Sequence, residues 1–268
     1  MKDFSSRYGF HVPPFTSEIP VDKHFSLPFL EEAVEGVVRT VERRQCAAVI
    51  APPGTGKTAV IRKARAKLPE ARNRVQYVHV TGLSKRELCR EICAVLGISS
   101  CGIFPMLVRR IQEYFLAISD TDALRPVLIL DEAHEIKPDV LGLLRVLTNF
   151  DMDSRLVVSI ILVGQTPLRD TLRRDDMEDV ARRLDHCATL RPLSQKETQD
   201  YIKHRCSIAG ARTVPFDADA ITAIYEVGRG NMRATDHLAV KTLEVAHLAD
   251  CKVASSTHVQ EASKVLWP

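Results

Sequence analysis

The sequence predicts an α/β fold: a mainly parallel, doubly wound sheet followed by a C-terminal helical lid. Short β-type apolar runs alternate with helical segments between residues 27 and 192, which is the pattern of strand–helix–strand units. A glycine-rich run at residues 51–58 joins one such strand to a helix, and only helical patterns follow Pro192. We therefore expect an N-terminal extension at 1–26, an α/β core at 27–192 and a helical lid domain at 193–268.

The elements of the expected core can be justified in chain order. Residues 27–44 have an amphipathic helical pattern, and 75–80 (V-Q-Y-V-H-V) has the β-branched and aromatic content of a strand. Ser84 and Glu87 form a capping box that opens a helix to about residue 96. The run at 156–163 (L-V-V-S-I-I-L-V) is typical of a strand buried on both faces. The remaining core elements are strands at 46–50, 127–130 and 187–190 and helices at 59–68, 104–118 and 138–149.

The lid is expected to be entirely helical. Its predicted helices cover residues 195–209, 217–227, 232–250 and 258–266.

The run at 51–58 (A-P-P-G-T-G-K-T) has the pattern of a phosphate-binding loop. Backbone N–H groups of such a loop and the positive end of the next helix point at one small volume, which suits a polyphosphate. Lys57 would reach the β- and γ-phosphates, and the Thr58 hydroxyl would bind Mg²⁺. The usual first glycine is Ala51 here, so the match depends on later residues. The predicted nucleotide-binding residues are Pro53, Gly54, Thr55, Gly56, Lys57, Thr58 and Ala59.

A second motif supports nucleotide hydrolysis. The apolar run at 127–130 ends in Asp131 and Glu132. In P-loop nucleoside triphosphatases an acidic residue at the end of such a strand holds Mg²⁺, and an adjacent glutamate can polarise the attacking water. We therefore predict that Asp131 supports the metal and that Glu132 is the general base.

Composition restricts the class of protein. The 268 residues are 45% hydrophobic and 26% charged, as in ordinary globular proteins. No apolar run approaches the ~18 residues that a membrane span needs, and the N-terminus has no signal-peptide pattern, so we expect a cytoplasmic protein without membrane attachment. The seven cysteines show no zinc-binding spacing. Although the net charge is only +3, residues 39–90 hold 13 Lys and Arg against 3 Asp and Glu, which is compatible with a polyanionic partner or with a solvated helix surface.

An α/β core with a helical lid is the architecture of AAA+ ATPases, and further residues match their roles. Gln165 follows the strand at 156–163, where a polar side chain can orient the attacking water. The segment V-A-R-R-L (180–184) lies where these ATPases carry an arginine that reaches a neighbouring subunit's nucleotide. Arg183 is the first candidate and Arg182 the second, although a solvated arginine pair would give the same pattern. In G-R-G-N-M-R (228–233), Arg233 is predicted to sense the γ-phosphate in its own subunit, with Arg229 as competitor.

Longer strings resemble a narrower group. I-L-V-G-Q-T-P-L-R (161–169), L-R-P-L-S-Q-K-E-T-Q-D-Y-I (190–202), G-R-G-N-M-R-A-T (228–235) and Y-G-F-x-x-x-P-F (8–15) look like the ExeA-like AAA+ family. That family includes ExeA/GspA secretion ATPases and transposition helpers similar to TniB, TnsC, MuB and IstB. Secretion members carry a membrane segment and a peptidoglycan-binding region after the ATPase, and this sequence ends at Pro268 without either, so we expect the transposition branch.

The resemblance implies ATP and Mg²⁺ as cofactors, a ring or helical homo-oligomer on double-stranded DNA, and recruitment or activation of a DDE transposase. Backbone contacts carry no sequence information, so the DNA binding would be non-specific. The candidate DNA contacts are Lys85, Arg86, Arg109 and Arg110. Two alternatives stay open: an ATPase adaptor in secretion or envelope assembly, and an ATP-gated DNA scaffold with little hydrolysis. The string D-E-A-H (131–134) is also a helicase signature, but the chain has room for only one such core.

Overall fold

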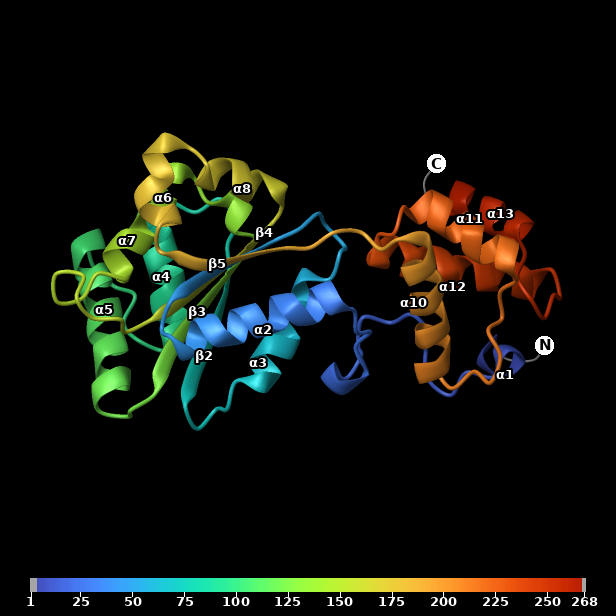
Figure 1. The fold of residues 1–268 in the computed structure, drawn as a ribbon, viewed down its shortest axis with the longest axis horizontal. Coiled ribbons are helices and arrows are strands. Elements are labelled where there is room, and N and C mark those ends of the chain that lie inside the picture. Colours follow the sequence, from blue (N-terminus) through green and yellow to red (C-terminus); the bar gives the residue numbers. More distant parts are fainter. Residues whose placement is uncertain (1–3, 267–268) are drawn as a thin grey trace. The chain divides into compact units, whose positions relative to one another are not determined.

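The computed structural model describes residues 4–266, and the chain divides into two compact units (Figure 1). The α/β unit comprises Pro28–Pro52 and Lys57–Leu190. The helical unit comprises Arg191–Pro268, the N-terminal segment Met1–Leu27 and the loop tip Pro53–Gly56, as far as these are described. The N-terminal segment, expected to be a separate extension, therefore groups with the C-terminal helices.

A five-stranded sheet with the order β2-β3-β4-β1-β5 forms the centre of the α/β unit. All four strand pairs are parallel, which confirms the predicted sheet type. β1, β3 and β4 lie inside the sheet, and β2 and β5 form its edges. The strands are β1 Cys46–Ile50, β2 Asn73–His79, β3 Arg125–Asp131, β4 Ser159–Gly164 and β5 Leu184–Thr189.

Helices cover both faces of the sheet, so it is doubly wound. Alternate side chains of β3 and β4, such as Leu130 and Leu162, join the apolar cluster formed with α4 and α5. The intervening side chains, such as Ile129 and Ile161, face α2 and α3 instead. This alternation follows from the twofold side-chain period of a strand, and it explains why the inner strands are apolar throughout. The helices are α2 Pro28–Glu42, α3 Lys57–Lys67, α4 Lys85–Leu96 and α5 Phe104–Asp120.

The capping box at Ser84 predicted the start of α4 correctly. Ser84 caps α4: its hydroxyl accepts a hydrogen bond from the Glu87 amide at 3.4 Å, and the Glu87 carboxylate accepts one from the Ser84 amide at 2.9 Å.

The helix expected at 138–149 is two short helices instead, α6 Pro138–Leu141 and α7 Leu143–Leu147, which meet at Gly142. β4 begins at Ser159 rather than at residue 156. The sequence did not predict the short elements α8 Thr166–Leu172, η3 Asp175–Met177 and α9 Glu178–Ala181, or η2 Ala133–Glu135.

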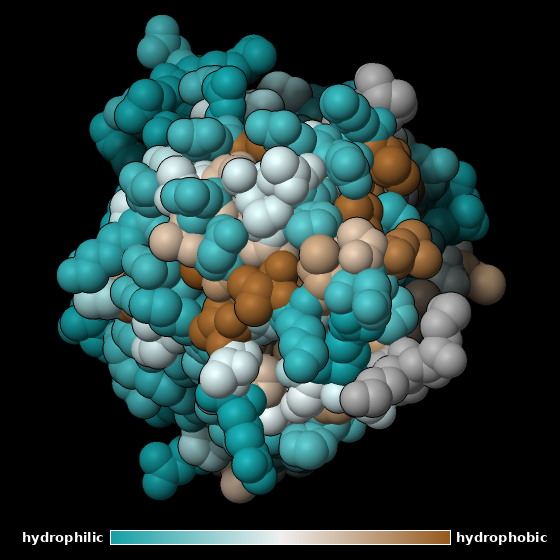
Figure 2. Space-filling view, turned by 90° about the vertical axis from the view of Figure 1, so that its right-hand side faces the viewer, coloured by the Kyte–Doolittle hydropathy of each residue, from teal (hydrophilic) through white to brown (hydrophobic). Residues whose placement is uncertain are grey.

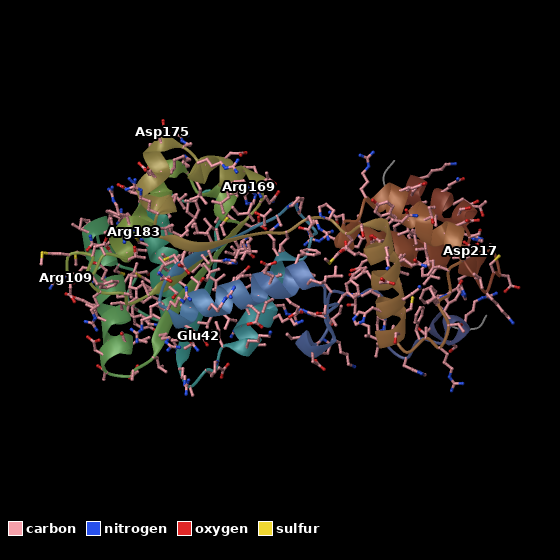
Figure 3. All side chains as sticks on the ribbon, viewed as in Figure 1. Glu42, Arg109, Arg169, Asp175, Arg183 and Asp217 are labelled. Carbon is pink, nitrogen blue, oxygen red and sulfur yellow. The ribbon has the colours of Figure 1, made fainter. Side chains whose placement is uncertain are left out.

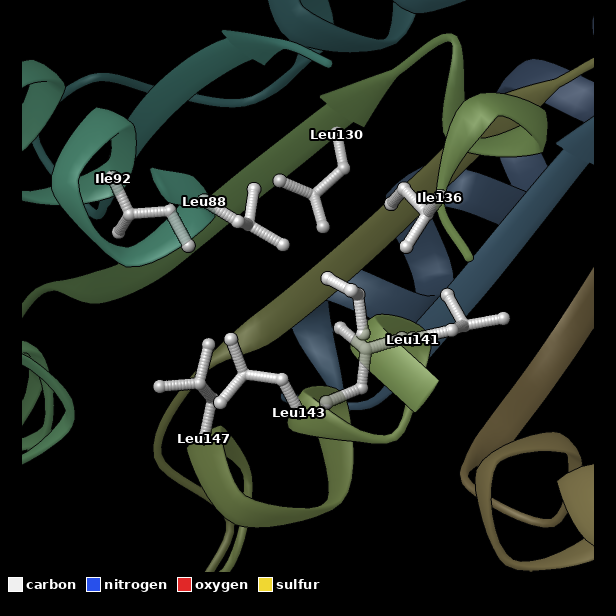
Figure 4. A pocket seen from close by; sticks show the side chains of 9 residues that line it. Leu88, Ile92, Leu130, Ile136, Leu141, Leu143 and Leu147 are labelled. Atoms are coloured by element: carbon white, nitrogen blue, oxygen red, sulfur yellow. The ribbon is translucent and has the colours of Figure 1, made fainter. Parts of the chain in front are cut away.

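Apolar side chains from α4, β3 and the α6–α7 region converge behind the sheet (Figure 4). Leu88, Leu130, Leu141 and Leu147 are among them, and the gap that they surround has no room for a water molecule. This region is therefore part of the core and not a ligand site.

The helical unit is built around aromatic side chains from its N-terminal segment. Tyr8, Phe10 and Phe15 pack with Ile202 and Leu238 in one apolar cluster. The face seen in Figure 2 is mostly hydrophilic at its margins, and apolar side chains gather near its centre. Its elements are α1 Phe4–Tyr8, η1 Val21–Lys23, α10 Gln195–Ile208, α11 Ala218–Gly228, α12 Met232–Leu248 and α13 Ser256–Leu266.

Candidate nucleotide-binding site

The glycine-rich loop connects β1 to the first turn of α3. Gly54 and Gly56 have φ values of 72° and 98°, a conformation that costs glycine little. Ala51 is not among the described residues with positive φ, and its amide extends the β1–β4 ladder by donating to the Gly164 carbonyl at 3.1 Å. The departure from the usual first glycine therefore imposes no backbone strain.

Lys57 is folded against its own loop. Its side chain is buried, and Nζ donates to the carbonyl oxygens of Ala51 at 3.1 Å and Pro52 at 3.2 Å. These bonds keep the ammonium group beside the loop where a polyphosphate would bind. Thr58 follows with an exposed side chain.

Within the helical unit, the loop tip contacts the start of α12. Asn231 caps this helix and donates to the Pro53 carbonyl at 2.6 Å. The Arg233 amide donates to the Gly54 carbonyl at 3.3 Å. A Cβ atom on Gly54 would lie 2.2 Å from the Asn231 side chain, so a larger residue there would displace that side chain from the loop. The backbone of Arg233 thus contacts the loop, whereas Arg229 ends α11 in a left-handed conformation.

Asp131 at the end of β3 is held at both carboxylate oxygens. Oδ1 accepts from the Glu132 amide at 2.9 Å, and Oδ2 accepts from the Tyr77 hydroxyl at 2.5 Å. Tyr77 comes from the neighbouring strand β2, whose register pairs it with Ile129, two residues before Asp131. Burial, followed by the hydrogen bond to Asp131, raises the pKa of Tyr77 well above its ordinary value. The phenol therefore stays protonated and continues to donate.

Glu132 lies between two polar side chains. Gln165, at the N-cap position of α8 directly after β4, donates to Glu132 Oε2 at 3.5 Å. His134 Nδ1 lies 3.3 Å from the same oxygen, and its Nε2 lies 3.4 Å from Glu135. Glu132 has a φ of 57°, an uncommon conformation that is concentrated at functional sites. The proposed base and the proposed water-orienting residue thus contact each other.

A cavity of about 120 Å³ lies beside Asp131 and Tyr77 on the α3 side of the sheet. Thr58, Asp131 and Tyr77 line it together with Arg62 and Arg65 of α3. A hydroxyl and a carboxylate facing one space are oxygen ligands of the kind that Mg²⁺ prefers, and this ion usually takes its other ligands from phosphates and water. No cluster of three or more His, Cys, Asp or Glu side chains suited to a metal occurs in residues 4–266. The residues therefore fit a metal bound together with a nucleotide.

Arg183 precedes β5 and is paired within its own unit. Its guanidinium donates to both carboxylate oxygens of Asp153 at 2.8 Å and to Thr148 Oγ1 at 3.2 Å, and its side chain is 21% exposed. Arg182 is 74% exposed and pairs with Glu178. The salt bridge lowers the pKa of Asp153, so this carboxylate is ionised. Figure 3 labels Arg183 and also Arg169, which donates to Thr189 Oγ1 at 2.9 Å.

The four candidate DNA contacts lie on α4 and α5, and each has a partner. Lys85 Nζ lies 3.7 Å from Asp139, and Arg109 donates to Glu113 at 2.8 Å. Arg86 donates to the Gly102 carbonyl at 3.0 Å, and Arg110 donates to the Cys101 carbonyl. All four remain exposed or partly exposed, so the structure neither gathers them into a site nor removes them from the surface.

Sequence reasoning missed three groups: Tyr77, Asn231 and Asp153. Each acts through a partner that is distant in the sequence, and the separation between Asp153 and Arg183, for example, is 30 positions. Only Asn231 carried a local signal, because it is a good N-cap residue before a helical pattern.

Comparison with known proteins identifies the class. The family model described as an AAA domain matches residues 39–172, half of the chain. The chain therefore belongs to this family and is a nucleotide-hydrolysing AAA+ ATPase.

One curated relative and several solved structures are similar to this chain. The chain is 29% identical to general secretion pathway protein A of Aeromonas hydrophila over 196 residues, which are 72% of this chain and 35% of that protein. Its fold is similar to Cdc6p of Pyrobaculum aerophilum, with a TM-score of 0.73, 18% identity and coverage of 94% and 70% of the two chains. It is also similar to the Aeropyrum pernix ORC1 protein in complex with DNA, with a TM-score of 0.66, 16% identity and coverage of 92% and 68%. The chain spans about a third of the length of the secretion protein that it matches.

No helix among the described residues has the length and apolarity needed to cross a bilayer.

Proposed function

We propose that this chain is an ATPase that assembles on double-stranded DNA when ATP is bound, and that it recruits or activates a DDE transposase there, in the cytoplasm. In each subunit Lys57 holds the phosphates, Thr58 and Asp131 hold Mg²⁺, and Glu132 accepts a proton from the attacking water. Gln165 orients Glu132 and that water. Arg233 responds to the γ-phosphate in its own subunit.

The position of Arg183 is the observation that carries the proposal. β1 and β5 are parallel neighbours: Leu184 pairs with Cys46 at the start of the strands, and Thr189 pairs with Ile50 at their end. The phosphate-binding loop follows Ile50, whereas Arg183 precedes Leu184. Arg183 is six residue steps from Thr189, so at about 3.3 Å per step it lies about 20 Å from the end of the sheet where the loop begins. At that distance Arg183 cannot reach its own phosphates, which supports the nucleotide of an adjoining copy as its proposed partner.

This arrangement makes assembly depend on the state of the nucleotide. A triphosphate offers the neighbour's guanidinium a doubly charged terminal group, and charge-assisted bonds to such a group are among the stronger protein contacts. The existing partner, Asp153, is half exposed, and exposed ion pairs contribute only about 0.2–1 kcal/mol. The γ-phosphate can therefore compete for Arg183. Hydrolysis removes that phosphate and weakens the contact between subunits.

Two observations support DNA as the partner. Residues 39–90 carry a strong excess of Lys and Arg, and a protein of similar fold was solved in complex with DNA. Lys85, Arg86, Arg109 and Arg110 are the proposed contacts to the DNA backbone. Several subunits in a ring or filament would add their contacts, so the affinity should decrease steeply with salt, with a slope of about −0.9 per phosphate contacted.

A gel-shift series tests the proposal. A long non-specific duplex is incubated with the protein and ATP, ADP or a slowly hydrolysed ATP analogue, from low to high salt. We expect retention with ATP and the analogue, loss of retention with ADP, and a steep salt dependence. Equal retention in all nucleotide states, or none in any, would contradict the proposal.

The relative from Aeromonas favours a second candidate, a nucleotide-gated adaptor in secretion or envelope assembly. That function requires a protein partner and gives no salt-sensitive DNA retention. A third candidate, a DNA scaffold that uses ATP only as a structural ligand, would show retention with ATP but no phosphate release. Measuring phosphate release in the gel-shift samples distinguishes these candidates.

A further inference from the structure

An exposed methionine marks the loop before β4. Residues 151–153 (D-M-D) connect Phe150 to the short segment that leads into this strand, and Met152 is 96% exposed. Asp151, Met152 and Asp153 have φ values of 49°, 55° and 68°. Three successive non-glycine residues in the left-handed region are costly, and strain of this kind is concentrated at functional sites.

The loop is firmly held despite its strain. An antiparallel β-bridge joins Phe150 to Arg155 at the base of the loop. The Ser154 hydroxyl donates to the Asp151 carbonyl at 2.6 Å. Asp153 forms the bidentate salt bridge with Arg183. The loop therefore presents one apolar side chain between two carboxylates, with Arg183 attached to it.

The cavity on the α3 side of the sheet has the complementary chemistry. Ile61, Val75 and Ile129 form its apolar wall, and Arg62 and Arg65 line it from α3. Thr58 and Asp131 lie at the same cavity, so it extends to the catalytic groups. Its volume of about 120 Å³ suits a single unbranched side chain such as methionine, which adapts well to irregular gaps.

The loop does not face the cavity of its own subunit. Phe150 at the base of the loop packs in the apolar cluster formed with α4 and α5, whereas the cavity is on the α3 face. The loop also precedes the first residue of β4, whereas Asp131 is the last residue of β3. Because β3 and β4 are parallel, the start of one and the end of the other lie at opposite ends of the strands.

We propose that the loop at residues 151–153 of one copy docks in the α3-side cavity of an adjoining copy. Met152 would pack against the apolar wall, and Asp151 would face Arg62 and Arg65. Asp153 would enter the cavity together with Arg183, so docking brings this arginine to the end of the cavity that Thr58 and Asp131 line. There Arg183 can release Asp153 and bind the terminal phosphate instead. The inference rests on the proposed ATP-dependent assembly and identifies the surfaces that form it. Because the two surfaces differ, the contact is head-to-tail and gives a ring or a filament.

Cysteine cross-linking between two different chains tests the contact. The exposed or partly exposed cysteines Cys101, Cys187 and Cys251 are first replaced by serine. One chain then carries Met152→Cys and the other Val75→Cys, and the two are mixed with DNA, a short bifunctional maleimide and either the slow ATP analogue or ADP. We expect a cross-linked heterodimer with the analogue and much less with ADP. The control pairs Met152→Cys with Ile103→Cys, whose side chain is 62% exposed just before α5, and should give no product.

Light scattering on the same samples separates the possible failures. If the protein assembles with the analogue but residues 152 and 75 do not cross-link, the docking inference is wrong and the proposed function stands. If no assembly forms with any nucleotide, both are wrong.

A charge reversal gives a second test in full-length protein. Arg65→Glu should raise the protein concentration for half-maximal assembly by about 10-fold. Adding Asp151→Arg to the same chain should bring this concentration most of the way back to the wild-type value, because every interface then carries the reversed charge pair. Met152→Ser should weaken assembly by about 10-fold through lost apolar contact. The side chains of Arg65, Asp151 and Met152 are all exposed, so these variants should fold. Assembly unchanged by both Arg65→Glu and Met152→Ser would overturn the inference.

Discussion

The hydrogen bond from Tyr77 to Asp131 offers a sharp test of the proposed magnesium site. Replacing Tyr77 by phenylalanine removes one hydroxyl and keeps the ring that lines the cavity. The lost bond is 2.5 Å long and ends on an ionised carboxylate. The other carboxylate oxygen keeps its bond to the Glu132 amide. Asp131 would therefore remain in place but could rotate away from the orientation that faces Thr58.

The size of the effect follows from the bond and its exposure. Hydrogen bonds to charged groups contribute about 1.5–3 kcal/mol. Tyr77 is 44% exposed, so water can replace part of the lost bond, and about 1–1.5 kcal/mol is the reasonable range. Because about 1.4 kcal/mol corresponds to a tenfold change, Tyr77→Phe should raise the half-saturating Mg²⁺ concentration by roughly 5- to 15-fold.

Phosphate release measured across a Mg²⁺ titration at saturating ATP gives this value directly. At saturating Mg²⁺ the turnover of the variant should approach that of the wild type. Tyr114→Phe is the matched control, because this tyrosine packs against the apolar cluster on the α4 and α5 side, and its Mg²⁺ requirement should not change. A Tyr77→Phe variant that needs the same or less Mg²⁺ than the wild type would refute the positioning role.

Three further predictions concern the proposed catalytic base and the helical unit. Glu132→Gln should bind ATP, lose about 10²- to 10⁴-fold in turnover and remain on DNA in pull-downs with ATP; turnover near the wild-type rate would remove Glu132 from its role. Burial raises the pKa of Asp236 from 3.8 to about 7, against the opposing effects of Arg205 and Tyr201. Between about pH 4 and pH 7 the folded chain therefore holds a proton that the unfolded chain has lost. The free energy of unfolding should fall as the pH rises through this range. Urea unfolding should show that Asp236→Asn lacks this decline, and parallel pH profiles for both proteins would contradict the assignment. Gly230→Ala should lower the melting temperature much more than Gly9→Ala: both glycines have φ near 72°, but only at Gly230 does the added Cβ meet a carbonyl oxygen, that of Leu193, at 1.9 Å.

Local sequence patterns were sufficient for most of the fold. The capping box at Ser84 and the alternation of strands and helices depend on residues close together in the chain, so they can be recognised without knowing the tertiary structure. The failures also have local causes. Gly142 divides a helical pattern that reads as continuous, and Leu156, which looks like a strand residue, lies before β4 and is 55% exposed.

The candidate site was predicted only in part, for a similar reason. Lys57 and Asp131 belong to motifs with fixed spacing, and the structure places their strands in one parallel sheet. The partners that hold them depend on strand register and on tertiary packing. Tyr77 reaches Asp131 because β2 pairs with β3 in one particular register, and Asp153 reaches Arg183 because two loops meet at the starting edge of the sheet. Neither pair has a sequence signal.

The central claim is that one copy completes the active site of another, and a mixing experiment tests it most directly. Lys57→Ala cannot hold the phosphates and Arg183→Ala cannot supply the arginine, so each variant alone should release almost no phosphate in the presence of DNA. In a mixture, the intact loop of the Arg183→Ala chain can meet the intact Arg183 of the Lys57→Ala chain. We predict that phosphate release rises well above the sum of the two separate rates; a mixture as inactive as its components, although the two chains assemble together, would contradict the account.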